Sequence, residues 1–423
     1  MNILDSVNIE GFWGSKRISI DLHKDVNFFI GVNGSGKTTV INLIAATLLA
    51  DFKTLDRIDF SLIRLELSEV GGRRKPVIEI EKRQDEDSPY QNIIYRIKEK
   101  SSDKFKEYSL DEFEEETLIR RRISPRHYQM YMRKMNRGIL SKLQSLTNTS
   151  WLSIHRATSD ERLSEEESYE SSVDLKLNQL GQSLASYFAV LSSRVSDEIA
   201  EFQRNLIVSL LTEQEETAVL TSVSKLDLEK EKKSLEEIFS KLKISATRKL
   251  EKHFINARKA LEKLNKKEPL DITELMYLIG SYRSHRVVQD WNELLEKQAE
   301  IMKPKNTFIE MLNELFQRKS VQINDRNQIE VTTESGKRFS IRGLSSGEKQ
   351  LVIILGEALL QQSSPWIYIA DEPELSLHVS WQENLISNLR ALNPNAQILC
   401  ATHSPDIVST FSSNVFNMEE EIR

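Results

Sequence analysis

The chain of 423 residues contains a single cysteine, only 14 glycines and no long apolar run. Cys400 alone cannot form an internal disulfide, and it excludes a zinc hook or ribbon built from paired Cys-x-x-Cys motifs. The scarcity of glycine favours helices over a turn-rich all-β fold. No stretch reaches the roughly 20 apolar residues of a membrane-spanning helix, and no signal peptide is recognisable. We therefore expect a cytoplasmic protein with no membrane partner.

An excess of basic residues is also missing, because 58 Lys and Arg face 64 Asp and Glu and the net charge is −6. This balance excludes a uniformly basic nucleic-acid coat, so contact with nucleic acid would need a local basic patch. Residues 120–137 are such a stretch, in which Arg and Lys alternate with His127, Tyr128 and Tyr131. Two interpretations stay open. The stretch could follow a phosphate backbone, or it could be a solvated helix balanced by the acidic residues 112–116.

The order of apolar patterns divides the chain into three regions. Within residues 1–160, the first 100 predict short strands, interrupted by a helix over 38–51 directly after a glycine-rich loop, and residues 110–145 predict a charged helical stretch. Residues 161–318 predict helices, and residues 319–423 return to strands that alternate with helices. Alternation of strands and helices is typical of an α/β core. The first and third regions would then form one domain, with the second inserted between them.

The inserted region is rich in Lys, Glu and Leu, a composition typical of exposed or coiled helices. Residues 226–266 predict one long helix of this kind. Polar residues near 212–224 and Pro269 mark breaks, so we expect helices that fold back on each other as an arm. The heptad pattern is imperfect, which favours a short coiled coil over a long regular one.

The strongest motif is GVNGSGKT at residues 31–38, between an apolar strand at 26–30 and the predicted helix. It matches the P-loop pattern in the context that the pattern requires. Glycines let backbone N–H groups converge on phosphate oxygens, and the helix N-terminus adds its positive end. Lys37 would reach the β- and γ-phosphates, and Thr38 would ligate Mg²⁺. The expected nucleotide-binding residues are Gly31, Asn33, Gly34, Ser35, Gly36, Lys37, Thr38 and Thr39.

A second motif is the acid pair Asp371 and Glu372, which follows the apolar run at residues 366–370. This pattern describes a buried strand that ends at the nucleotide. Asp371 would hold Mg²⁺, while Glu372 would orient and deprotonate the attacking water. An acid pair alone is weak evidence, because most such pairs are solvated strand ends. The pair becomes stronger evidence for a nucleotide site because the same chain contains a P-loop.

A third motif, LSSGEKQ at residues 344–350, resembles the signature of ABC-type ATPases in the variant found in SMC, RecF and OLD-like proteins. The resemblance implies that Ser345, Gly347 and Glu348 act at the γ-phosphate bound by a second subunit. It therefore implies a homodimer or higher oligomer through paired heads. Ser345 also fits an ordinary helix N-cap, and the two roles are compatible.

The sequence after the acid pair continues the resemblance. PELSLH at residues 373–378 stands where this family has its D-loop, and ATHSP at 401–405 stands where it has the switch histidine, here His403. The family implies an α/β fold, an ABC-type P-loop NTPase head with a mixed sheet, an antiparallel β subdomain and a helical insertion. It also implies ATP and Mg²⁺ as cofactors, and ATP hydrolysis that depends on Lys37, Glu372 and His403.

The spacing between the motifs narrows the choice among the branches of this ATPase family. The long insertion between Lys37 and Ser345 is unlike ABC transporter subunits, and it is too short for a complete SMC protein. The short stretch after His403 leaves no room for the TOPRIM nuclease of OLD proteins, so we expect no nuclease domain in this chain. The chain then resembles ATPase subunits of bacterial anti-phage systems. Arm size and the SSGEKQ and ATHSP contexts favour the PtuA-like family of Septu systems, also found with retrons, over the AriA-like family of PARIS.

Three functions are consistent with these observations. In the favoured one, the ATPase senses infection and regulates a separate effector nuclease, of HNH type in the PtuA-like family. The alternative is a RecF- or SMC-like DNA-binding ATPase in DNA repair. A binding module with a silent ATPase is the third, and the intact Lys37, Asp371, Glu372 and His403 argue against it. Slow turnover would fit the resemblance.

Overall fold

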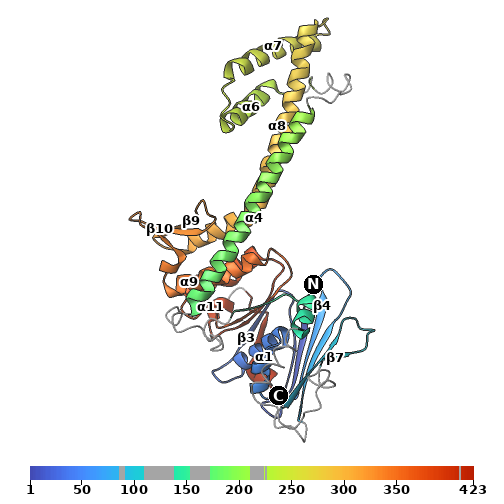
Figure 1. Ribbon diagram of the computed structural model, residues 1–423, viewed down its shortest axis with the longest axis vertical. Coiled ribbons are helices and arrows are strands. Elements are labelled where there is room, and N and C mark those ends of the chain that lie inside the picture. The colour runs from blue at the N-terminus through green and yellow to red at the C-terminus, as the bar shows by residue number, and fades with distance from the viewer. Residues whose placement is uncertain (85–90, 109–137, 153–171, 210–222, 224–225, 409–410) are drawn as a thin grey trace. The chain divides into compact units, whose positions relative to one another are not determined.

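The computed structural model describes residues 1–84, 91–108, 138–152, 172–209, 223, 226–408 and 411–423. The described chain divides into two compact units (Figure 1). The head unit comprises Met1–Ala185 and Thr307–Arg423, and the helical unit comprises Ser186–Asn306. The head unit is therefore built from both ends of the chain, with the helical unit inserted between them.

A parallel sheet of five strands lies at the centre of the head unit, in the order β14-β3-β13-β12-β8. Every neighbouring pair in it is parallel. Carboxyl ends of parallel strands meet at one edge, so the segments that follow β3, β13 and β12 are neighbours there. Its strands are β3 (Val26–Ile30), β8 (Thr149–Leu152), β12 (Ile367–Asp371), β13 (Gln397–Ala401) and β14 (Val415–Asn417).

The second sheet of the head unit is antiparallel, with six strands in the order β2-β1-β4-β5-β6-β7. In β4 the side chains of Ile63, Leu65 and Leu67 are buried and alternate with less buried neighbours, as expected for a sheet with one apolar face. The strands are β1 (Asn2–Phe12), β2 (Lys16–Asp21), β4 (Leu62–Glu69), β5 (Val77–Gln84), β6 (Gln91–Lys98) and β7 (Lys106–Tyr108).

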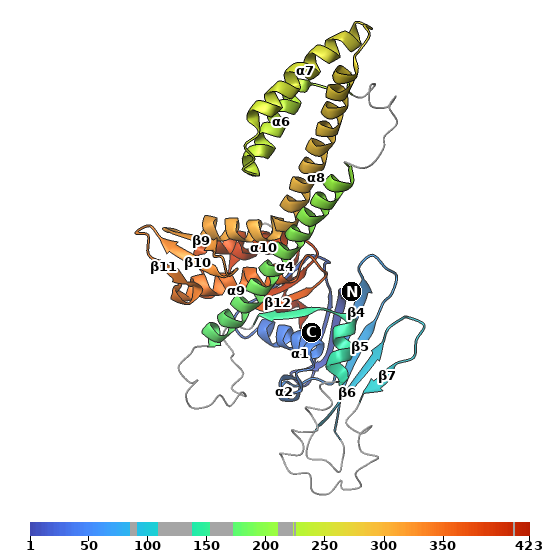
Figure 2. The same ribbon diagram turned by 45° about the horizontal axis from the view of Figure 1, so that its top comes forward.

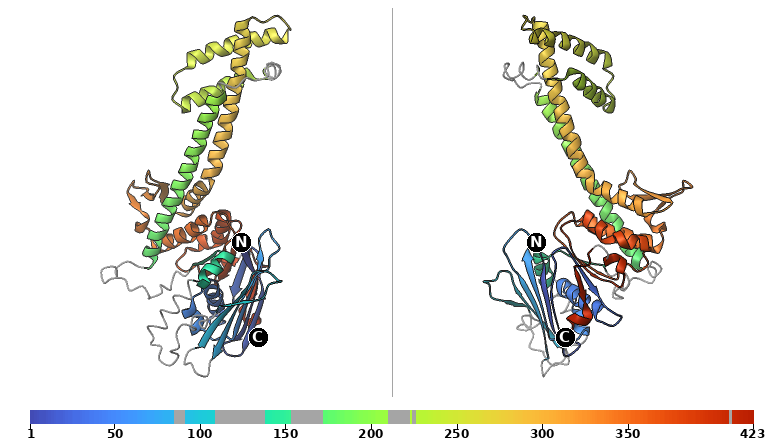
Figure 3. Two further views of the ribbon diagram at one scale, coloured as in Figure 1. Left: turned by 45° about the vertical axis from the view of Figure 1, so that its right-hand side comes forward. Right: turned by 180° about the vertical axis from the view of Figure 1, so that it is seen from behind.

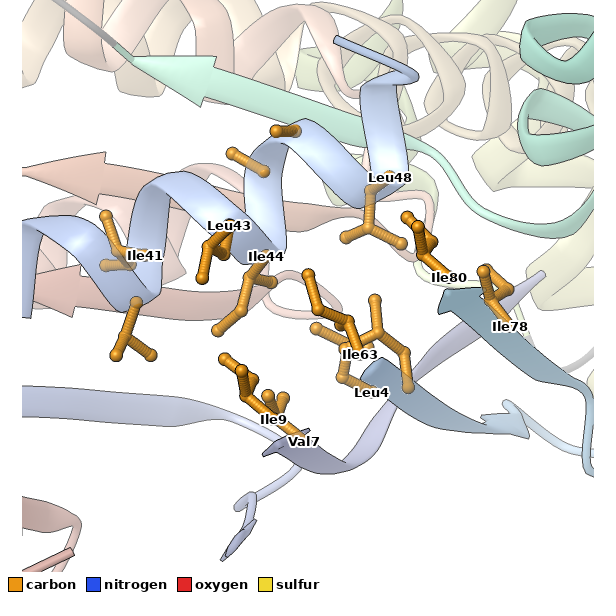
Figure 4. Close-up of a cluster of buried hydrophobic side chains, with 14 of the residues drawn as sticks. Leu4, Val7, Ile9, Ile41, Leu43, Ile44, Leu48, Ile63, Ile78 and Ile80 are labelled. Atoms are coloured by element: carbon orange, nitrogen blue, oxygen red, sulfur yellow. The ribbon is translucent and has the colours of Figure 1, made fainter. Parts of the chain in front are cut away.

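Helix α1 (Lys37–Leu49) packs against both sheets. Figure 4 shows Ile44 and Leu48 of α1 facing side chains of β1, β4 and β5. The same apolar cluster includes Ile369 of β12 and Leu399 of β13. A helix covered on opposite sides must be apolar nearly all round, which explains why ten of its residues are buried. The predicted α/β head with an antiparallel β subdomain is confirmed.

The rest of the head unit carries the signature motif and the elements around it. A small antiparallel sheet, β11-β10-β9, precedes helix α9, whose apolar residues are buried. The remaining elements are α2 (Phe52–Arg57), a helix over residues 138–146, β9 (Lys319–Ile323), β10 (Ile329–Thr333), β11 (Arg338–Ser340), η3 (Ile341–Gly343), α9 (Ser346–Leu360), α10 (Val379–Leu392), α11 (Pro405–Val408) and α12 (Met418–Glu421).

The helical unit contains the second part of α4 (Ser172–Ser209) and most of α8 (Ile272–Leu315), which run side by side (Figures 1 and 3). The rings of Phe202 and Trp291 lie 5.7 Å apart, and Lys297 pairs with Glu198 at 3.3 Å. Helices α6 (Leu228–Lys241) and α7 (Thr247–Asn265) complete the unit. The predicted helical insertion is therefore present.

The prediction of one long helix over residues 226–266 is wrong, because the chain turns back between α6 and α7. Lys243 adopts a left-handed conformation with φ of 56°, and the N–H of Ile244 donates to the carbonyl oxygen of Phe239. This hydrogen bond closes the end of α6 as helix C-terminal motifs do. The turn lets Leu235 of α6 and Phe254 of α7 join one apolar cluster. A single straight helix would leave that surface exposed.

Helices long and apolar enough to cross a bilayer do not occur in the described residues.

Candidate active site

The P-loop connects β3 to α1 and keeps the geometry that its glycines allow. Gly36 caps α1 with φ of 92°, a conformation that a residue with a side chain rarely adopts. At Gly34, where φ is 85°, a Cβ atom would meet nothing within 4 Å, so the loop is open on that side. Asn33 is exposed on the same loop, whereas Ser35 and Thr39 are half-buried. The loop thus presents backbone to an open face, as phosphate binding requires.

Lys37 has a buried side chain, with an exposed fraction of 4%. Its ammonium group donates to the carbonyl oxygens of Gly31 and Val32 at 2.8 and 3.0 Å. Burial lowers the pKa of Lys37, and the nearby carboxylates of Glu372 and Asp371 oppose that shift. Burying a cation is costly, and a phosphate group would supply an additional anionic partner for the Lys37 ammonium. The P-loop therefore fits a nucleotide triphosphate.

Ser35 gives a second indication that the loop fits a ligand. Its hydroxyl oxygen is buried and has no hydrogen-bond partner among the described residues. Buried polar atoms in folded proteins normally have a partner in the protein, water or ligand. A polar ligand in the loop, or an ordered water beside it, would satisfy this hydroxyl.

Thr38 and Asp371 meet although they are distant in the sequence. The Thr38 hydroxyl donates to the Asp371 carboxylate at 3.0 Å, joining the start of α1 to the end of β12. Hydroxyl and carboxylate oxygens suit Mg²⁺, which takes one or two protein ligands with phosphates and water. No group of three or more His, Cys, Asp or Glu side chains that could hold a metal lies in the described residues. The pair fits a metal shared with phosphates.

Glu372 follows directly and sits in a strained backbone conformation. Its φ is 48°, which is uncommon for a residue with a side chain. The N–H of Glu372 donates to the carbonyl oxygen of Ala401 at 2.8 Å, so the turn after β12 is tied to the end of β13. This turn places the Glu372 carboxylate 3.9 Å from Nε2 of His403. The two predicted catalytic side chains therefore face each other at the sheet edge.

Glu374 is a residue of this site to which the sequence interpretation gave no role. Glu374 is 8% exposed, and its Oε1 accepts from the Thr402 hydroxyl at 2.5 Å and from the N–H groups of His403 and Ser404 at 3.0 and 3.3 Å. Its Oε2 is buried without a partner in the described part of the chain. Glu374 thus fixes the segment of residues 402–404, which includes His403, through these hydrogen bonds. The only sequence signal was a second acid two positions after Glu372.

We predict that Glu374→Ala lowers kcat by roughly 10- to 100-fold with little change in ATP affinity, because His403 would lose its fixed position. Steady-state hydrolysis and equilibrium ATP binding measure the two quantities separately. Glu374→Gln keeps one acceptor oxygen for the three donors and should restore much of the rate. Equal losses of kcat and of ATP affinity in Glu374→Ala would mean that the residue only supports the fold.

The signature motif forms its own cluster at the start of α9. Ser345 is the N-cap residue, and it exchanges hydrogen bonds with Glu348 in a capping box. Both Glu348 carboxylate oxygens also accept from the Lys319 ammonium at 2.8 Å. Burial alone would raise the pKa of Glu348, but the hydrogen bonds from Lys319 and Ser345 hold it below its usual value. The expected N-cap is present, and Glu348 is ionised to serve it.

This cluster touches the turn that follows β12. A Cβ atom at Gly347 would lie 2.4 Å from the carbonyl oxygen of Ser376, so only glycine fits. The side chain of Gln350 donates to the carbonyl oxygen of Pro373 at 2.9 Å. The signature helix and the turn with the acid pair are therefore in direct contact within one chain.

Residues outside the sequence motifs pack against the outer side of the P-loop. A Cβ at Gly36 would lie 3.0 Å from Ile422 Cδ1 and 3.2 Å from Trp13 Cη2. The carboxylate of Glu419 accepts from the N–H of Val32 at 3.0 Å. The β1–β2 turn and α12 thus meet at this loop. The basic stretch 120–137, by contrast, lies outside the described residues.

The region that contains this site matches a known protein family. The sequence profile of the AAA ATPase domain matches residues 1–408. A retron Vc95 probable ATPase of Vibrio cholerae is 27% identical over 38% of this chain and 32% of the relative. A retron Ec83 probable ATPase of Escherichia coli is 31% identical over 20% of this chain and 17% of the relative. The Septu protein PtuA of Bacillus thuringiensis is 28% identical over 29% of this chain and 34% of the relative. The matched regions span about a third or less of each curated relative.

Solved structures with similar folds include SMC head domains. One from Pyrococcus furiosus with an extended coiled coil, bound to the C-terminal domain of ScpA, shares 14% identity at a TM-score of 0.38, covering 97% of this chain and 92% of that one. Another, from Pyrococcus yayanosii with a coiled coil and joint, shares 16% sequence identity at a TM-score of 0.34. It covers 97% of this chain and 93% of that one. At these scores the family profile and the strand order, rather than the superposition, carry the fold assignment.

Proposed function

The chain belongs to the AAA ATPase domain family, and from this premise we propose that it binds and hydrolyses ATP with Mg²⁺. The observation that carries the proposal is the meeting of Thr38 with Asp371, and of Glu372 with His403, beside the P-loop lysine. These side chains come from three separate segments of the chain, at the start of α1, at the end of β12 and after β13. Their convergence is the arrangement that phosphoryl transfer to water needs.

Each residue has one task in the proposed reaction. Lys37 and the P-loop N–H groups would bind the phosphates, and Thr38 and Asp371 would hold Mg²⁺, which would neutralise phosphate charge. Glu372 accepts a hydrogen bond from the attacking water and takes its proton. His403 donates a hydrogen bond to the γ-phosphate or to the water. Glu374 keeps the His403 segment in place.

We propose further that two heads pair, so that Ser345, Gly347 and Glu348 of one copy complete the nucleotide site of the other. The exposed side of the P-loop at Gly34 leaves room for such a contact. The N-terminus of α9, with its partial positive charge, suits the γ-phosphate. ATP would then hold the pair together, and hydrolysis at Glu372 would set how long it lasts.

The biological role that we propose is regulation of a separate nuclease in bacterial anti-phage defence. The similarity to retron probable ATPases and to the Septu protein PtuA supports this role, although it covers part of each relative. The family resemblance favours an HNH-type partner. In this role the ATPase contributes sensing and timing, and the partner contributes nucleic-acid cleavage.

Affinity purification tests the proposed partner. Tagged Glu372→Gln protein, purified from its native host, should carry a nuclease in a fixed stoichiometric ratio, because the blocked head retains ATP and stays paired. Lys37→Ala protein, which should not bind ATP, is the matched control for nucleotide-dependent capture. Recovery of stoichiometric DNA without any protein partner would instead favour the DNA-repair alternative.

A further inference from the structure

Two hairpin loops project from one end of the six-stranded sheet. Residues 70–76 connect β4 to β5, and residues 99–105 connect β6 to β7. Because β4, β5, β6 and β7 are successive antiparallel neighbours, both loops lie at the same end. The N-terminus is there too, since the N–H of Val70 donates to the carbonyl oxygen of Met1 at 3.1 Å. Figure 2 shows the two loops and the N-terminus together.

Basic residues gather on these loops and at the strand ends that carry them. They are Arg73, Arg74, Lys75, Lys98, Lys100, Lys104 and Lys106. We call this set the basic hairpin surface. It stands out in a protein whose net charge is −6, and all of its members except the half-buried Lys98 are exposed. A local excess of cations in an acidic protein points to an anionic partner.

Three of the four acidic residues at this end, Glu69, Glu99 and Glu107, form ion pairs, and the fourth, Asp103, keeps its charge. Arg74 forms a two-pronged ion pair with Glu69, and Lys142 pairs with Glu99. The carboxylate of Asp103 accepts from the N–H of Lys100 at 3.1 Å. Arg73, Lys75, Lys100 and Lys104 are left with no ion-pair partner among the described residues, so their charges face solvent.

We propose that the basic hairpin surface binds the phosphate backbone of duplex DNA. Lysine and arginine side chains on adjacent loops can neutralise successive phosphates and release their counter-ions, which drives such binding without reading the base sequence. The flexible side chains of the exposed lysines suit point contacts with phosphates.

A duplex fits this surface better than a single strand. Proteins that hold single strands stack bases on exposed aromatic rings. The two loops contain one aromatic residue, Phe105, which is 37% exposed. The ammonium group of Lys98 lies 5.1 Å from the centre of that ring and covers one of its faces. Charge is therefore the main feature that this surface offers.

The basic hairpin surface is remote from the P-loop. Asn2 of β1 pairs with Glu69, beside the loops, whereas Glu10 pairs with Leu62 at the opposite end, next to Trp13 and the P-loop. An antiparallel strand the length of β1 spans about 35 Å, at roughly 3.4 Å per residue. Changes at the loops should therefore leave the nucleotide site unaltered, and DNA binding by this surface does not depend on the proposed ATPase reaction.

The test compares binding of a fluorescent 30-base-pair DNA duplex by wild type and by Lys75→Gln/Lys100→Gln/Lys104→Gln. Anisotropy titrations over a series of salt concentrations should show the triple variant binding at least roughly 10-fold more weakly at low salt. The slope of log K against log salt should fall by up to about 3, at roughly 0.9 for each phosphate that the variant no longer neutralises. The matched control is Lys230→Gln/Lys233→Gln/Lys241→Gln, which removes the same charge from exposed sites of the helical unit.

Several results would overturn the proposal. One is wild-type protein that fails to bind the duplex at low salt, and another is an equal loss of affinity in the control variant. Single-stranded DNA that binds more tightly than the duplex would exclude duplex recognition. Poly-glutamate that competes as well as DNA, charge for charge, would assign the surface to an acidic protein. Unchanged ATP affinity in the triple variant verifies that its head is folded.

Discussion

Glu372→Gln should bind ATP as tightly as wild type and lose hydrolysis, with kcat lower by roughly 10²- to 10⁴-fold. The amide cannot accept the proton of the attacking water, yet it keeps nearly the same shape 3.9 Å from His403. Lys37, Thr38 and Asp371, to which we assign binding of the phosphates and the metal, are unaffected. Single-turnover phosphate release measures the rate, and equilibrium titration with ATP measures the affinity.

The same variant should accumulate as an ATP-dependent dimer, which light scattering can follow. The control is Glu372→Gln/Ser345→Arg, whose bulky cation at the start of α9 should prevent pairing while one head still binds ATP. Wild-type rates of hydrolysis in Glu372→Gln would show that another group is the base. A dimer that survives Ser345→Arg would show that heads do not pair through the signature motif.

Lys37→Ala should abolish nucleotide binding, with a loss of affinity of about 100-fold or more. Hydrogen bonds between a cation and phosphate oxygens are strong, and removing both charge and donors costs about 3 kcal/mol or more. Burial lowers the pKa of Lys37, so the folded protein carries this cation at a cost. We therefore expect the unliganded variant to melt no lower than wild type.

Thermal unfolding with and without ATP checks both parts of this expectation. Wild type should gain stability with ATP, whereas Lys37→Ala should show no gain. Lys24→Ala is the matched control, since Lys24 is an exposed lysine before the other end of β3. A nucleotide-induced gain in Lys37→Ala equal to that of wild type would contradict the assigned role. A large drop in the unliganded melting temperature would mean that Lys37 supports the fold.

Elements whose signals are local in the sequence were predicted closely. The helix expected at 38–51 is α1 at Lys37–Leu49, and the strand expected at 366–370 is β12 at Ile367–Asp371. In both cases an apolar pattern and a motif mark the same boundary. Motif order also placed Asp371 and His403 at the edge where Lys37 lies, because strands that alternate with helices form a parallel sheet.

Features that depend on distant contacts could not be predicted. Glu374 acquires its role only when the segment after β13 comes beside it, and Lys319 meets Glu348 across the small antiparallel sheet and α9. The turn after α6 lacks glycine and proline, so composition favoured an unbroken helix. The left-handed Lys243 there is stabilised by apolar packing between α6 and α7, which is a tertiary effect.

The close packing of Gly347 on Ser376 makes the proposed pair of heads a thermodynamically linked system. The surface that would sense the neighbour's nucleotide is fixed to the turn that carries the chain's own Glu372, with no side chain between them to absorb a shift. Whatever free energy one bound ATP contributes to the conformation of that turn, the second ATP must feel in equal measure, because coupling between binding sites is reciprocal. If this coupling favours binding, occupancy of the two sites rises together over a narrower range of ATP concentration than for independent heads.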